Sequence, residues 1–337
     1  MTMIDSPRPL IETPDVAVAT QRVDLLSDVL AHIRLSGAVF LHGEYSAPWA
    51  LSSPDNPDLI ALLAPGTARL ILFHIVREGS VWMSACGFRV EAEAGDIVVL
   101  PHAHQHAMGS LERAEPVPIA TLLPTPPWQG IPTCRVEGGG ETAQIVCGYL
   151  RCGDLLFNSF MRRLPPIFRV RPPKGPTAEW IRACINYALD QSEQPRQGSA
   201  MMLSRLPELL LIEVLRLHCE QDQNGTGWLA ATGDPLIGRA LALIHAAPAR
   251  KWTVDDLACC AATSRSVLDA RFRDVLGQAP IRYLAEWRMQ LAADLLRSTD
   301  LKMAAIAEEV GYGSEEAFSR AFQRHLGRSP AEWRCAA

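Results

Sequence analysis

Residues 302–330 read KMAAIAEEVGYGSEEAFSRAFQRHLGRSP, two helical patterns separated by a short turn that contains two glycines. In the first pattern, Ile306 belongs to a set of apolar residues at helical spacing. Ser314 can cap the second helix, which buries Phe318 and Phe322. Glycine tolerates the positive φ of a tight turn, so the second helix can leave at a steep angle. The stretch therefore predicts a helix-turn-helix unit.

A second copy of this pattern lies upstream, in TVDDLACCAATSRSVLDARFRDVLGQAP, residues 253–280. Thr253 and Ser264 can cap its two helices, and it ends in LGQAP where the other copy ends in LGRSP. Residues 280–300 between the copies predict one long helix that holds them at a fixed separation. A single copy is also common in ordinary helical bundles. Two copies joined by a rod favour a module whose second helices enter successive major grooves of DNA.

The polar residues on the outer faces of these second helices are the candidate DNA contacts. Arginine can pair with guanine, carboxylates accept from cytosine, and Ser and Gln reach base edges or phosphates. The candidates on the first helix are Arg265, Ser266, Asp269, Arg271 and Arg273, and those on the second are Ser314, Glu315, Glu316, Ser319, Arg320, Gln323 and Arg324.

Length and charge agree with a chain of more than one domain. The chain has 337 residues, 48% of them apolar and 20% charged, which is ordinary for a globular protein. The net charge is −5, but residues 234–337 hold 14 basic and 13 acidic residues and are near +1. Such a balance excludes indiscriminate binding to nucleic acid, whereas a local basic face stays compatible with it. We expect no membrane span and a cytoplasmic location.

The N-terminal half carries a different pattern. Short apolar runs broken by turn residues, such as ARLILFHIVREG and AGDIVVLPHAH, predict closely spaced strands of a β-sandwich or small barrel. The predicted organisation is a flexible arm over 1–22, a sensor domain over 23–165, helices over 166–221 that connect or dimerise, a linker over 222–233 and a helical domain over 234–337. Residues 23–35 can form one helix ahead of the strands.

The helical domain resembles the DNA-binding domain of AraC/XylS-type transcription regulators over residues 234–334. The matching motifs include Thr253-Val-Asp-Asp-Leu-Ala, Phe272-Arg-Asp-Val-Leu-Gly, Val310-Gly-Tyr, Phe318-Ser-Arg-Ala-Phe and Gly327-Arg-Ser-Pro. The resemblance implies two helix-turn-helix subdomains on adjacent major-groove segments, and control of transcription through RNA polymerase, with activation and repression both left open. Ala270 and Ala317 depart from the family pattern, where basic and aromatic residues are common.

The N-terminal half resembles the cupin-like sensor domains that precede this DNA-binding module. Gly95, Pro101 and His106 match the second cupin motif best, whereas the paired histidines of the first motif are missing. The expected fold is thus an α+β multidomain chain, with an N-terminal cupin-like β-barrel plus helices and a C-terminal all-α double helix-turn-helix domain.

Three kinds of signal remain open for the sensor domain. His74, His106 and Cys147 can supply zinc-type ligands, for zinc or another divalent metal, although such residues in strands are more often core. An oxidant can act on Cys147, with Cys152 and Cys134 nearby. A small organic effector can bind among residues that otherwise would be core, namely Trp49, Phe73, His74, Trp82, His104 and His106.

The sequence as a whole predicts a sequence-specific DNA-binding transcription regulator, not an enzyme, controlled by a signal sensed in the N-terminal domain. Residues 199–221 predict an apolar helix that either packs on its own barrel or forms a homodimer interface. The alternative function is a cupin-type metal-dependent enzyme with a helical C-terminal domain, and the missing histidine pair argues against it.

Overall fold

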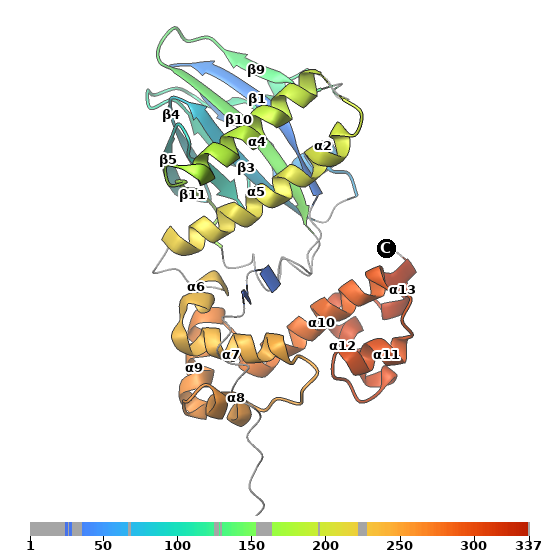
Figure 1. Cartoon of the computed structure of the whole chain (residues 1–337). Coiled ribbons are helices and arrows are strands. Elements are labelled where there is room, and N and C mark those ends of the chain that lie inside the picture. Colours follow the sequence, from blue (N-terminus) through green and yellow to red (C-terminus); the bar gives the residue numbers. More distant parts are fainter. Residues whose placement is uncertain are drawn as a thin grey trace, which may run out of the picture.

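The computed structural model describes residues 24, 25, 27–28, 36–66, 69–124, 128, 130–152, 164–194, 196–221 and 228–335. The predicted arm over 1–22 lies outside these residues, as does most of the helix predicted over 23–35. A β-rich part formed by residues up to 221 lies above a helical part that begins at 228 (Figure 1). Among the described helices, none has both the length and the apolar character that crossing a bilayer requires.

The β-rich part contains two sheets. The six-stranded sheet has the order β11-β6-β3-β10-β1-β9, with bounds Phe168–Val170, Ile97–Leu100, Arg69–Glu78, Thr142–Cys152, Ser36–Ser46 and Thr133–Val136. The five-stranded sheet has the order β5-β4-β7-β2-β8, with bounds Phe88–Glu93, Ser80–Ala85, His106–Gly109, Ala50–Ser52 and Val117–Pro118. Most pairs are antiparallel, and β9 and β8 add parallel edges. The expected cupin-like barrel is confirmed.

The position of β3 in the sheet explains why its sequence is a continuous apolar run. Successive side chains of a strand point to opposite faces. Leu72 and Val76 belong to the apolar cluster shared with the second sheet. Phe73 and Ile75 belong to a second cluster, on the outer face, that includes residues of the following helices. Both faces of this sheet are therefore covered, and alternation of polar and apolar residues disappears.

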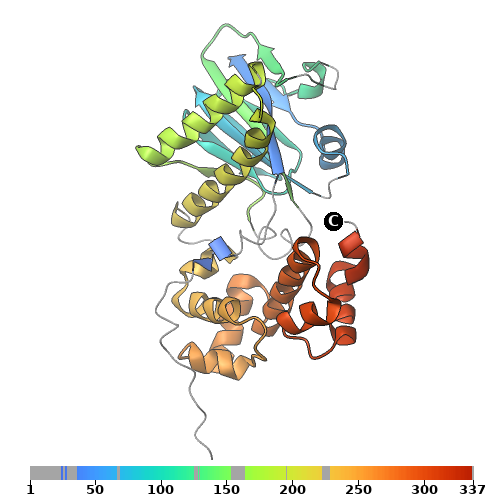
Figure 2. The ribbon, with the colours of Figure 1, turned by 45° about the vertical axis from the view of Figure 1, so that its right-hand side comes forward.

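Two helices cover the outer face of the six-stranded sheet, as Figures 1 and 2 show. They are α4 (Pro176–Glu193) and α5 (Ser199–Gln221), and α5 contacts β1 most closely. A shorter helix, α2 (Asn56–Leu63), follows β2, and a 3₁₀ turn spans Ile119–Thr121. Strand β11 and both helices fall within the predicted connecting segment over 166–221, yet they complete the sheet and its covering layer. This segment is physically part of the β-rich domain.

The C-terminal part is all-helical, as predicted. Its helices are α6 (Trp228–Gly233), α7 (Pro235–Ala246), α8 (Val254–Cys260), α9 (Arg265–Leu276), α10 (Pro280–Ser298), α11 (Met303–Glu309), α12 (Glu315–Leu326) and α13 (Pro330–Cys335). Helices α8–α9 and α11–α12 form the two helix-turn-helix units, and Figure 1 shows α10 running between them. Helix α6 lies inside the segment predicted as a linker over 222–233.

The two parts of the chain touch through apolar and polar contacts. Leu25 joins the cluster that runs from the outer face of the sheet into the first helix-turn-helix unit. Nearby, the Asp28 carboxylate lies 2.5 Å from Nδ1 of His245 on α7, and the other ring nitrogen of His245 lies 2.7 Å from the Tyr283 hydroxyl. The N-terminal segment thus contacts the helical domain directly.

Both helix-turn-helix turns use the same backbone device. Ala262 and Gly311 have positive φ, 54° and 82°. The amide after each, in Thr263 and Tyr312, donates to a carbonyl five residues earlier. This pattern closes the C-terminus of α8 and of α11 in the same way. The second turn is one residue longer, because Gly313 precedes its N-cap, Ser314.

We predict that Gly311→Ala destabilises the full-length protein much more than Gly327→Ala does. Both glycines have positive φ, which alone costs alanine about 1 kcal/mol. A Cβ at Gly311 would also lie 2.4 Å from the Ala249 carbonyl oxygen, whereas one at Gly327 would meet nothing within 4 Å. Chemical denaturation followed by far-UV circular dichroism measures the difference, expected to exceed ~1 kcal/mol. Equal losses in the two variants would show that the contact with Ala249 carries no weight.

Candidate functional site

Helices α9 and α12 are built on one plan. Ser264 and Ser314 cap them by accepting from the amide three residues later, and Gly277 and Gly327 close them in the left-handed region. Each position of α9 therefore corresponds to the position fifty residues later in α12. Their inner faces are packed, by Leu268 and Phe272 in α9 and by Phe318 and Phe322 in α12. The opposite face of each helix is left for a ligand.

The structure leaves every predicted DNA-contacting side chain at least partly exposed. Asp269 and Ser319 are half-buried, and the other ten predicted residues are exposed: Arg265, Ser266, Arg271, Arg273, Ser314, Glu315, Glu316, Arg320, Gln323 and Arg324. Both helices therefore present polar side chains to solvent, as contact with a groove requires.

On α9 the arginines are neutralised by carboxylates of the same domain. Arg265 lies 2.9 Å from Asp255 of α8, and Arg273 lies 2.9 Å from Asp269. Arg271 lies 2.9 Å from Asp234, whose carboxylate also caps α7. Exposed ion pairs such as these contribute little stability, so phosphate groups could displace them. Arg271 differs from the others because its partner anchors another helix.

On α12 the charges are arranged differently. Arg320 and Arg324 are exposed and form no salt bridge with any residue that the structure describes. Their counterparts in α9 are Ala270 and Asp274, an apolar and an acidic residue. The acids of α12, Glu315 and Glu316, lie in its first turn, where the helix dipole favours them. Hydrogen bonds from its own amide and from Ser314 lower the pKa of Glu316.

The orientation of one unit relative to the other is fixed by a contact that sequence patterns did not reveal. Gly311, in the turn of the second unit, packs against the backbone of Ala249, in the loop before the first unit. From α10, the Arg288 guanidinium donates to the carbonyls of Pro248 and Arg250, at 2.7 and 2.8 Å. The same guanidinium lies 5.7 Å from the Tyr312 ring centre. One side chain thus connects both units.

Inside the barrel, the structure brings together the three residues predicted as metal ligands. His74 Nδ1 lies 3.0 Å from Cys147 Sγ, and the rings of His74 and His106 are 4.9 Å apart. Yet no group of three or more His, Cys, Asp or Glu among the described residues is arranged to hold a metal ion. The zinc site therefore stays a prediction, without support from this arrangement.

Burial keeps this cluster uncharged. It lowers the pKa of His74 well below its ordinary value, with a smaller contribution from His106, and it lowers the pKa of His106 to about 4. Burial also raises the pKa of the Cys147 thiol. A thiol reacts as its thiolate, so Cys147 is poorly suited to reaction with an oxidant. The side chain of Cys152, its predicted redox partner, lies outside the described residues.

The residues predicted to bind an organic effector do not line one pocket. Trp49 is buried in the core between the sheets, against Tyr45. Phe73 and His74 are adjacent on β3, so they lie on opposite faces of the sheet. Trp82 is half-buried beneath Arg89, and His104 is half-buried and stacks against His102. Of these residues, Phe73 lines the cavity beneath α4 and α5, and the effector site over the whole set stays a prediction.

Two protein families match the chain. A family described as cupin matches residues 24–220, and a helix-turn-helix domain family matches residues 257–336. A putative AraC-like transcription regulator of Streptomyces lividans is 36% identical over 276 residues, 79% of this chain and 87% of that protein. The Acinetobacter baylyi regulator AlkR is 28% identical over 319 residues, 93% of this chain and 99% of its own.

Among solved structures, the DNA-binding domain of AdpA in complex with a target DNA is 35% identical, with a TM-score of 0.29. It matches 31% of this chain and 92% of its own. The relatives named here are transcription regulators, so the alternative of a metal-dependent enzyme is not supported.

We predict that the neutral barrel cluster makes stability fall in acid. The unfolded state has a histidine pKa near 6.5 and the native His106 about 4, so the unfolded state binds more protons between these values. Stability present above pH ~6.5 is then lost as pH falls, by ~1.4 kcal/mol per unit for each such histidine. Denaturation at pH 7 and pH 5 should show about 2 kcal/mol less acid loss in His106→Gln than in wild type.

The reference is the wild-type protein, measured at the same two pH values. An acid loss in His106→Gln equal to that of wild type would contradict a buried, neutral His106.

Proposed function

Because the chain belongs to the AraC-like transcription regulators, DNA-binding proteins that here carry a cupin domain ahead of a helix-turn-helix domain, we propose that α9 and α12 are its recognition helices. Each reads one of two successive major-groove segments. The observation that carries this proposal is the repeat of one helix-turn-helix plan at both ends of α10, with the units tied by Arg288. Such a rigid pair fits one face of the double helix.

Helices α9 and α12 differ in how their charged side chains can contact DNA. Arg320, Gln323 and Arg324 of α12 are exposed and available for bidentate contacts to guanine or for phosphates. On α9, Arg265 and Arg273 exchange their carboxylates for phosphates when DNA arrives. Arg271 instead keeps Asp234 and helps to hold α7. Recognition by α12 is then the stronger of the two.

The N-terminal domain is the sensor in this proposal, and its signal alters how the DNA-binding domains engage a promoter and RNA polymerase. Because the proposed target is chromosomal DNA, the protein would act in the cytoplasm. Continuity of the apolar cluster from the sheet to the first helix-turn-helix unit supports communication between the parts. Leu25 and Asp28 add a contact from the N-terminal segment to the same unit.

A homodimer is the second element of the proposal. Helix α5 buries Leu210 and Leu217 against its own domain but exposes Met201, Met202 and Leu209, which are 73%, 53% and 50% accessible. Exposed apolar side chains gathered on one helix favour an interface with another copy.

We predict that Arg320→Ala weakens specific DNA binding about tenfold to a hundredfold, because one base contact contributes ~1–3 kcal/mol. A gel-shift titration of full-length protein on the DNA upstream of its own gene measures the loss. Arg271→Ala should weaken specific binding less than Arg320→Ala does, since Arg271 is paired with Asp234. Arg135→Ala, on β9 and paired with Glu44, is the matched control and should bind normally. Full affinity in Arg320→Ala would refute the role of α12.

We predict that replacing both Met202 and Leu209 by glutamate converts a dimer to a monomer, because a charge on this strip cannot be buried against a second copy. Sedimentation equilibrium over a range of concentrations gives the mass. Phe88→Glu, which changes a 56% exposed side chain on β5, should leave the dimer intact. A wild-type protein that sediments as a monomer at every concentration would rule out this interface.

A further inference from the structure

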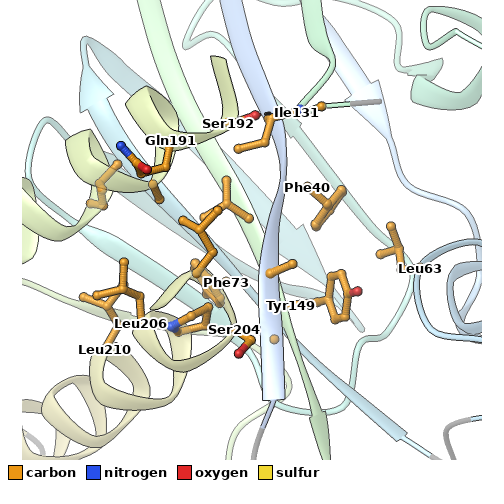
Figure 3. Close-up of a pocket in the computed structure, with 18 of the residues that line it drawn as sticks. Phe40, Leu63, Phe73, Ile131, Tyr149, Gln191, Ser192, Ser204, Leu206 and Leu210 are labelled. Atoms are coloured by element: carbon orange, nitrogen blue, oxygen red, sulfur yellow. Dashed lines mark hydrogen bonds between the residues drawn. The ribbon is translucent and has the colours of Figure 1, made fainter. Parts of the chain in front are cut away.

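A cavity of about 790 Å³ lies around β1 and β10 of the six-stranded sheet, beneath α4 and α5 and beside α2. Its lining includes Phe73 of the outer cluster and Tyr149 of the cluster shared with the second sheet. Figure 3 shows Phe73 and Tyr149 from the sheet, Gln191 and Ser192 from α4, and Leu206 and Leu210 from α5 around it. The volume is within the range typical of small-molecule sites. Neither His74 nor Cys147, the buried pair inside the barrel, is among the residues that line this cavity.

The cavity exists because the sheet carries glycine where its floor is formed. A Cβ on Gly148 would lie 1.9 Å from the Phe73 ring, so the end of this ring occupies the space that a side chain on β10 would need. Gly37 of β1 allows Pro207 of α5 to come close, since a Cβ there would be 3.1 Å from Pro207 Cβ. The helix is thereby held near β1 at one end of the cavity. The remaining walls are mostly apolar side chains.

One polar group of this lining lacks a partner. The Gln191 side chain is 1% exposed, and its amide nitrogen donates to the Asp190 carboxylate at 2.9 Å. A carboxylate only accepts, so this bond fixes which end of the amide is the oxygen. The Gln191 Oε1 atom is buried and accepts no hydrogen bond from any described residue. Leaving a buried carbonyl unsatisfied is unfavourable, and a ligand with an O–H or N–H would remove that cost.

The lining also contains no charged side chain among the described residues. Its polar members are hydroxyls and one amide, such as Ser192, whose Oγ accepts from the Ile131 amide at 2.9 Å. An anion or cation in this cavity would lose its hydration without gaining an opposite charge. The site therefore disfavours a carboxylate or an amine and favours a neutral molecule.

We propose that this cavity binds an uncharged, largely apolar small molecule whose single hydroxyl or N–H group donates to Gln191 Oε1. Only the role of this ligand as a signal rests on the function proposed above. Helix α5 forms one wall through Leu206 and Leu210, exposes Met202 and Leu209 to a partner, and contacts α6 of the helical domain. A molecule in the cavity would change the position of all three.

The test is equilibrium dialysis of the full-length protein, near neutral pH, against three probes of one chain length: decanol, decyl methyl ether and decanoate. The ether lacks the donor and decanoate carries a charge. Decanol should bind about tenfold more tightly than either, the effect of one hydrogen bond to a buried acceptor. Gln191→Leu should still bind decanol but lose the preference over the ether, and its melting temperature should be equal to or above that of wild type.

Two filling variants locate the site. Leu206→Trp and Ala188→Leu should each abolish decanol binding while keeping the far-UV circular dichroism spectrum of wild type. Unchanged decanol binding in both, no binding of any probe, or a preference for decanoate would overturn the proposal. The gel shift without ligand tests the proposed function separately. A protein that binds decanol but no promoter DNA would contradict the proposed function and leave the ligand site supported.

Discussion

The close approach of Gly311 to Ala249 is the contact on which the arrangement of the helical domain depends. It brings the turn of the second helix-turn-helix unit against the loop that precedes the first. Arg288 reinforces it by donating to two carbonyls of that loop while lying near the Tyr312 ring. A long helix alone fixes only a separation, because the units at its ends could still rotate about it. The backbone contact also fixes the rotation of one unit about α10 relative to the other. Two recognition helices need such a fixed orientation to enter successive segments of the major groove.

The six-stranded sheet separates the β-rich domain into two environments. Its inner face looks into the barrel, where His74 Nδ1 contacts Cys147 Sγ and burial disfavours the charged form of both side chains. Its outer face is covered by α4 and α5, and it leaves a cavity whose buried acceptor is unsatisfied. Histidines and cysteines are the more conspicuous residues in the sequence. The cavity beneath α4 and α5, by contrast, is lined mostly by residues that look like ordinary core.

Comparison of α9 with α12 shows how one plan produces unequal surfaces. The caps match at a spacing of fifty residues, and so do two buried positions, Leu268 with Phe318 and Phe272 with Phe322, so the two units share one plan. The outward positions do not match in this way. Arg320 of α12 corresponds to Ala270 of α9, and Arg324 corresponds to Asp274. Packing restricts the inner face to residues of similar shape, whereas solvent leaves the outer face free to vary. The unequal charge is therefore the part of the repeat that is available for specificity.

The sequence by itself determined the elements that depend on local chemistry. Caps such as Thr253 and Ser314, the turn at Gly311 and the two apolar periodicities predicted both helix-turn-helix units, and the short apolar runs predicted the strands. Only the tertiary structure decided which distant residues meet. It separated Phe73 from His74, paired Arg271 with Asp234, and packed β11 and α4 into the β-rich domain. It also left the Gln191 oxygen without a hydrogen-bond partner among the described residues. Capping and periodicity act over a few residues, whereas these contacts join segments far apart in the chain, and their identity follows from how the whole sheet and its helices pack.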